Sequence, residues 1–149
     1  MSKQILQELK AHPFAYGLIG IFAIVQCVLL FQPLPFLLSN LLPDDAFYYF
    51  ETARNIIAGN GSTFDGIHPT NGYHPLWMLI LLPIFALFSI GGVLDTAPLY
   101  ATLVLSLLLS ISTTLVVVRI LSRFTTSKLI EALALLLWCA SPFILYESL

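Results

Sequence analysis

Charged side chains are scarce in this sequence. Of its 149 residues, 9% are Asp, Glu, Lys or Arg and 58% are hydrophobic, whereas about 25% of an average soluble domain is charged. No Asp, Glu, Lys or Arg occurs from Ala11 to Pro43 or from Gly66 to Leu94. This composition excludes an ordinary soluble domain and predicts an integral membrane protein.

Basic clusters and paired cysteines are absent too. The six cations are scattered along the chain, so no stretch of it would follow a polyanion, and nucleic-acid binding is not expected. Cys27 and Cys139 both lie in apolar runs, where a thiol behaves as a small hydrophobe. These two cysteines therefore predict neither a disulfide framework nor a metal site.

Long apolar runs supply the membrane segments. A hydrocarbon core about 30 Å thick needs about 20 helical residues, and spans are predicted at about 14–31, 76–93, 99–118 and 129–146. The first run is longer than the apolar region of a signal peptide and is followed by prolines, so we expect it to be retained. The predicted fold class is all-α, a polytopic membrane helical bundle that forms a single membrane domain, 1–149.

A polar insert, 44–75, separates the first two predicted spans. Its first half repeats apolar residues at helical spacing, at Phe47, Phe50, Ala53 and Ile57. Asp44 and Asp45 suit the N-terminus of a helix, and Gly59 suits its end. We predict a short amphipathic helix at the membrane interface, with Tyr48 and Tyr49 at the level of the headgroups. The glycine-rich remainder predicts an ordered loop with tight turns.

The side of the membrane is predicted from charge. Lys3 and Lys10 favour a cytoplasmic N-terminus, which places the acidic insert outside, as the positive-inside rule prefers. If both following segments cross the membrane, however, the basic stretch 119–128 also lies outside, against that rule. We keep the N-terminus inside because the first span usually dominates.

The acidic pair Asp44 and Asp45 is the first candidate for chemistry. Helix-terminal N–H groups and the helix dipole stabilise a carboxylate, and an ionised aspartate can accept the proton of a hydroxyl or bind a metal ion. The alternative is that the pair only caps a helix at the interface.

Other polar residues of the insert also have two interpretations. Arg54 can pair with Glu51 on one helical face or contact a lipid phosphate. His68 and His74 can ligate a metal, transfer a proton or donate to a phosphate, with Asp65 close to His68 in sequence. Because their spacing matches no standard zinc pattern, no metal ligands are assigned. Asn71-Gly72 is typical of a turn, and Trp77 of an interface anchor.

Several ordered blocks of this insert resemble a known family. These blocks are Asp44-Asp45-Ala46-Phe47-Tyr48-Tyr49, Ala53-Arg54-Asn55-Ile56, Gly59-Asn60-Gly61-Ser62-Thr63-Phe64-Asp65-Gly66 and Pro69-Thr70-Asn71-Gly72-Tyr73-His74-Pro75-Leu76-Trp77. Together, over about residues 40–85, they are similar to the first loop of bacterial multi-spanning glycosyltransferases of the GT-C fold. That family is related to protein O-mannosyltransferases and to the lipid A aminoarabinose transferase.

The resemblance implies transfer of a sugar from a polyprenyl-phosphate carrier to a hydroxyl of a glycan, lipid or protein acceptor. It implies the bacterial inner membrane, with residues 44–75 on the extracytoplasmic side. Asp44 is favoured as the base over Asp45, and the residues implied to bind substrate or phosphate are Arg54, Asn71, Tyr73 and His74. Related branches differ in their need for a divalent metal, so a metal is possible but no cofactor is assigned.

Family members are several times longer than this chain. We therefore expect it to be an N-terminal portion, inactive alone, whose partners include further C-terminal helices and membrane lipid. The alternative function is a non-catalytic assembly or scaffold subunit whose loop binds a partner. A transporter is disfavoured, because the first three predicted spans contain no ionisable side chain.

Overall fold

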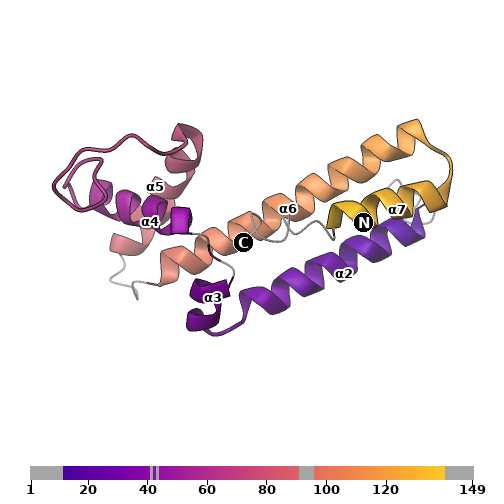
Figure 1. Ribbon diagram of the computed structural model, residues 1–149, viewed down its shortest axis with the longest axis horizontal. Helices are drawn as coiled ribbons and strands as arrows, with labels where there is room; N and C mark the ends of the chain where they lie inside the picture. Colours follow the sequence, from indigo (N-terminus) through magenta and orange to yellow (C-terminus); the bar gives the residue numbers. More distant parts are fainter. Residues whose placement is uncertain (1–11, 41, 43, 91–95, 140–149) are drawn as a thin grey trace. The chain divides into compact units, whose positions relative to one another are not determined.

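The computed structural model describes residues 12–40, 42, 44–90 and 96–139, with the backbone alone at Asp44 and Ile90. Within these residues the chain is all-helical, as predicted, and an isolated bridge joins Thr63 and Pro69. The helices in Figure 1 are α2 (Pro13–Leu30), α3 (Leu34–Asn40), α4 (Asp44–Ile57), α5 (Pro75–Ile90), α6 (Ala97–Phe124) and α7 (Lys128–Cys139).

Two of the described helices, α2 and α6, are long and apolar enough to cross a membrane, with 18 and 28 residues. Four spans were predicted. The second corresponds to α5, which has 16 residues, and its expected end at 91–93 lies outside the described residues. The fourth corresponds to α7, whose expected continuation over 140–146 also lies outside them.

The described chain divides into two compact units. One comprises Met1–Pro33 with Ser106–Leu149, and the other comprises Leu34–Leu105. This division by contacts does not test whether the chain forms a single membrane domain, so that expectation stays a prediction.

In the first unit, α2 and α7 pack against the C-terminal part of α6 (Figure 1). The buried core of this packing consists of Ala15, Ile19, Val118 and Leu135. Polar pairs give the directions of the helices: His12 Nδ1 lies 2.9 Å from Glu131 Oε2, Trp138 Nε1 donates to Thr114 Oγ1 at 3.3 Å, and Gln26 Nε2 donates to Ser110 Oγ at 3.4 Å. The N-termini of α2 and α7 therefore lie at the same end as the C-terminus of α6.

The basic stretch 119–128 is mostly helix rather than loop. Helix α6 continues past the predicted end at Val118 to Phe124, so Arg119 and Arg123 are helical, and three residues, 125–127, connect it to α7. No glycine or proline interrupts this stretch, and leucine and arginine favour a helix. The charge of the stretch led us to expect a loop, but the helical propensity of its residues prevails.

In the second unit, α4 packs against α5. Phe50, 8% exposed, stacks on Phe85 with ring centroids 5.9 Å apart, and Ala53 and Leu81 are fully buried between the helices. This contact fixes the orientation of α4, and with it the side chains that α4 carries.

Helix α4 ends as the sequence predicts. Gly59 has a positive φ of 85°, and its N–H donates to the carbonyl of Ile56, while the N–H of Asn60 donates to that of Asn55. This pair of bonds is the Schellman arrangement, in which glycine avoids the strain of a left-handed backbone. Helix α3 was not predicted, because the prolines at its start suggested a break, although Pro35 is compatible with a first helical turn.

Candidate functional site

The first turn of α4 carries both acidic residues, Asp44 and Asp45, here called the acidic turn. The N–H groups of a first turn have no partner within their helix, and the helix dipole adds a partial positive charge there. The side chain of Asp45 is exposed, and that of Asp44 lies outside the described residues. A negative charge is favourable at this end of a helix.

Two tyrosines one helical turn later hold another part of the chain, the 70–74 segment. The hydroxyl of Tyr48 is hydrogen-bonded to the hydroxyl of Thr70, and its ring stacks on Phe64 with centroids 5.4 Å apart. The hydroxyl of Tyr49 accepts the backbone N–H of His74 at 2.9 Å, and its ring contacts that of Tyr73. Residues three and four positions apart share a helix face, so the 70–74 segment lies on the side of α4 that carries Asp45.

A glycine permits this close approach. A Cβ atom at Gly72 would lie 3.2 Å from the hydroxyl oxygen of Tyr48, which is tighter than ordinary van der Waals contact. The Asn71-Gly72 pair, which the sequence suggested as a turn, therefore lies directly against α4.

The loop before this segment is closed by its own hydrogen bonds. Asn55 Nδ2 donates to the carbonyls of Thr63 and Phe64, at 3.1 and 3.0 Å. The N–H of Thr70 donates to the carbonyl of Ser62 at 2.7 Å, and Ser62 Oγ donates to the carbonyl of Thr70 at 2.6 Å. Ser62 Oγ also bonds the hydroxyl of Tyr73 at 2.8 Å. These bonds fix both ends of the loop on α4.

Asp65 and His68, neighbours in the sequence interpretation, form a pair in the structure. Asp65 Oδ2 bonds His68 Nδ1 at 2.6 Å, and Asp65 Oδ1 accepts the N–H groups of Ile67 and His68. The hydrogen bond from the His68 side chain, followed by the two backbone bonds, holds the pKa of Asp65 well below its ordinary range. The Asp65 carboxylate therefore stabilises the turn of its own loop.

Metal ligation by this insert, which the sequence left open, stays untested. The part of the chain that the structure describes contains no group of three or more His, Cys, Asp or Glu residues that could hold a metal ion.

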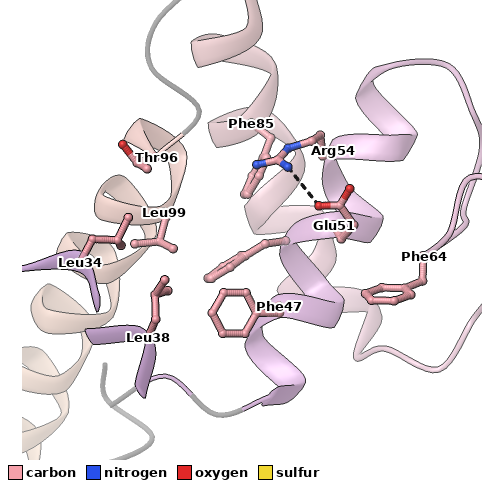
Figure 2. A pocket seen from close by; sticks show the side chains of 10 residues that line it. Leu34, Leu38, Phe47, Glu51, Arg54, Phe64, Phe85, Thr96 and Leu99 are labelled. Carbon is pink, nitrogen blue, oxygen red and sulfur yellow. Dashed lines mark hydrogen bonds and ion pairs between the residues drawn. The ribbon is translucent and has the colours of Figure 1, made fainter. Parts of the chain in front are cut away.

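Arg54 lies on a different side of α4 from Asp45. The two residues are nine positions apart, and at about 100° per residue they point in opposite directions. Arg54 Nη1 pairs with Glu51 Oε2 at 3.0 Å, as one interpretation of the sequence predicted. The pair borders a pocket of about 450 Å³, and Figure 2 shows Phe47 of α4 facing Leu34, Leu38 and Leu99 across it.

The structure thus separates the predicted site residues into two groups. Asn71, Tyr73 and His74 lie in the segment held beside the acidic turn, whereas Arg54 lines the apolar pocket. The sequence interpretation gave Tyr48 and Tyr49 an interfacial role and missed their bonds to the loop. The signal in the sequence was their position three and four residues after Asp45, which puts all three residues on one face of the helix.

No protein-family model, curated protein or solved structure matches this chain. The functional conclusion therefore depends on the residues of the site.

Proposed function

We propose that this chain supplies the acidic loop of a membrane glycosyltransferase that moves a sugar from a polyprenyl phosphate to an acceptor hydroxyl. One observation carries the proposal: Tyr49, four residues after Asp45, contacts the ring of Tyr73 and bonds the backbone of His74, which puts both residues on the side of α4 that carries Asp45. A carboxylate and an exposed imidazole are thus presented on one side of the helix.

These residues can perform the transfer as follows. A carboxylate of the acidic turn accepts the hydroxyl proton of the acceptor, and the acceptor oxygen forms a bond to the anomeric carbon. The bond from that carbon to the phosphate oxygen breaks, and the polyprenyl phosphate leaves with the electron pair. His74 donates a hydrogen bond to this phosphate and stabilises its developing charge, while Asn71 and Tyr73 contact the substrate.

The phosphate contact belongs to His74 rather than to Arg54. The charge of Arg54 is already paired with Glu51, and its side chain leaves α4 on the side opposite Asp45. A phosphate bound at Arg54 would be separated from Asp45 by the helix itself. Arg54, a phosphate candidate in the sequence, is left out of the reacting centre because its charge is already paired with Glu51.

The proposed location is the bacterial inner membrane, with residues 44–75 outside the cytoplasm. If α2 and α6 both cross, their antiparallel packing puts Lys3 and Lys10 on the same side as Arg119, Arg123 and Lys128, which agrees with the positive-inside rule. The described part of helix α5 has 16 residues and is about 24 Å long at about 1.5 Å per residue, and its expected continuation over 91–93 lies outside the described residues. We assign it to the outer face, without a crossing, which removes the conflict in the charge pattern.

The test is sugar transfer by membranes that contain this chain joined to the further C-terminal helices that the resemblance implies. Undecaprenyl-phosphate-linked glucose, galactose, mannose and N-acetylglucosamine, each radiolabelled, are supplied, and label in the acceptor fraction is counted. Wild-type protein is expected to transfer at least one sugar, and the Asp44→Asn/Asp45→Asn double variant to lose at least about a hundredfold in rate, the lower range for a removed general base. Equal transfer by both proteins would contradict the proposal.

The alternative of an assembly subunit gives a different result. The double variant would then insert normally, no donor would be consumed by either protein, and the substitutions would alter the composition of a purified complex.

A further inference from the structure

Tyr49 connects the acidic turn to the start of the next helix. Its hydroxyl accepts the N–H of His74 at 2.9 Å, and the carbonyl of His74 in turn accepts the N–H of Met78 in the first turn of α5. The backbone of His74 is therefore fixed on both sides, by α4 through its N–H and by α5 through its carbonyl, while its imidazole remains exposed. A fixed backbone limits the positions that the imidazole can reach.

Tyr49 bonds the backbone of His74, and other groups hold the rest of the segment. Thr70 is bonded to the hydroxyl of Tyr48 and to the backbone of Ser62, and Tyr73 is bonded to Ser62 Oγ. Loss of the Tyr49 hydroxyl would consequently release the His74 backbone while the loop stays closed at Ser62 and Thr70.

We propose that Tyr49 is a positioning residue for the phosphate site, which acts by holding His74 beside the acidic turn. This inference rests on the proposed function, in which His74 contacts the phosphate of the lipid carrier. A phenol is suited to the task because its oxygen accepts a hydrogen bond while the ring packs against Tyr73. Phenylalanine would keep the ring and remove the acceptor.

The first test is amide exchange of Tyr49→Phe, measured by NMR on the full chain in lipid nanodiscs. The His74 amide is expected to exchange at least about tenfold faster than in the wild-type protein, while the Thr70 amide, bonded to the Ser62 carbonyl, keeps its rate. Unchanged exchange at His74 would overturn the inference. Equal acceleration at both amides would also overturn it, because Tyr49 would then hold the whole loop.

The second test is binding of undecaprenyl phosphate to the same nanodiscs, with undecaprenol as the control that lacks the phosphate. Tyr49→Phe and His74→Ala are each expected to weaken binding of the phosphate about tenfold, and Tyr100→Phe, a matched change on α6, to leave it unchanged. In the Tyr49→Phe/His74→Ala double variant the loss should equal that of His74→Ala alone, since a residue that acts through His74 has no effect without it.

The outcomes separate this inference from the proposed function. Additive losses in the double variant, or equal losses for undecaprenol, would overturn the role of Tyr49 and leave the acidic turn as the base. Wild-type protein that does not bind undecaprenyl phosphate would overturn both proposals. Transfer that survives Asp44→Asn/Asp45→Asn would overturn the proposed base, whatever the binding results.

Discussion

Two aspartates of the insert have different environments and therefore different roles. All three hydrogen bonds at Asp65 come from its own turn, whereas Asp45 is exposed at the end of a helix, where its carboxylate can meet a ligand. The residue type alone does not distinguish them. Their partners do, and this difference favours the acidic turn over Asp65 as the place of the proposed base.

The pairing of Asp65 predicts a pH dependence. Because its pKa in the folded protein lies below its ordinary value of about 4, the ionised Asp65 carboxylate stabilises the loop above about pH 4, and this contribution is lost as the pH falls below that value. The NMR titration midpoint of the Asp65 carboxyl should lie clearly below 4 and move upward in His68→Ala, which removes the largest cause. A midpoint that does not move in this variant would contradict the assignment.

Helix α4 presents different groups on its different faces. Phe50 and Ala53 pack on α5, Tyr48 and Tyr49 hold the loop, and Arg54 borders the apolar pocket. The contact with α5 orients all of these groups, so the site depends on packing that lies away from it.

Truncation of Phe50 tests this dependence. Phe50→Ala should lower the free energy of unfolding by about 3 to 5 kcal/mol, because it leaves a cavity against Phe85, and it should also weaken the protection of the His74 amide. Phe31→Ala, at a side chain 83% exposed, should change the free energy by less than about 0.5 kcal/mol. Denaturant unfolding in detergent compares the two variants, and equal effects would show that the Phe50 contact does not support α4.

The sequence predicts local features of these elements better than their contacts. The apolar spacing in α4 and the glycine at position 59 predicted the helix and its end, because both depend on neighbouring residues. The bonds from Tyr48 and Tyr49 to residues more than 20 positions away could not be predicted, since they require the folded loop. Helix α3 and the extension of α6 were missed because prolines and charges were taken as helix ends.

At the scale of the whole molecule, the packing of α2 against α6 changes the predicted topology. The antiparallel packing of α2 and α6 places the described basic residues Arg119, Arg123 and Lys128 at the end where α2 begins. When each predicted segment is taken to cross the membrane in turn, the sequence alone puts these cations on the side opposite to the N-terminus.

Cysteine labelling in intact cells tests this topology. In a background with Cys27→Ala and Cys139→Ala, a cysteine at Ile67 should react with a membrane-impermeant maleimide, and a cysteine at Thr126 should react after permeabilisation alone. Labelling of Thr126→Cys from outside intact cells would mean that α5 crosses the membrane as well.

The claim that the acidic turn supplies the base is tested most directly by one ratio of transfer rates in membranes. Glu51→Gln makes the same carboxylate-to-amide change about two turns further along α4, at a side chain that is paired with Arg54, so it serves as the matched control for Asp44→Asn/Asp45→Asn. We predict near wild-type transfer of the undecaprenyl-linked sugar by the first variant and a loss of at least about a hundredfold in the second. Similar rates for the two variants would contradict the account.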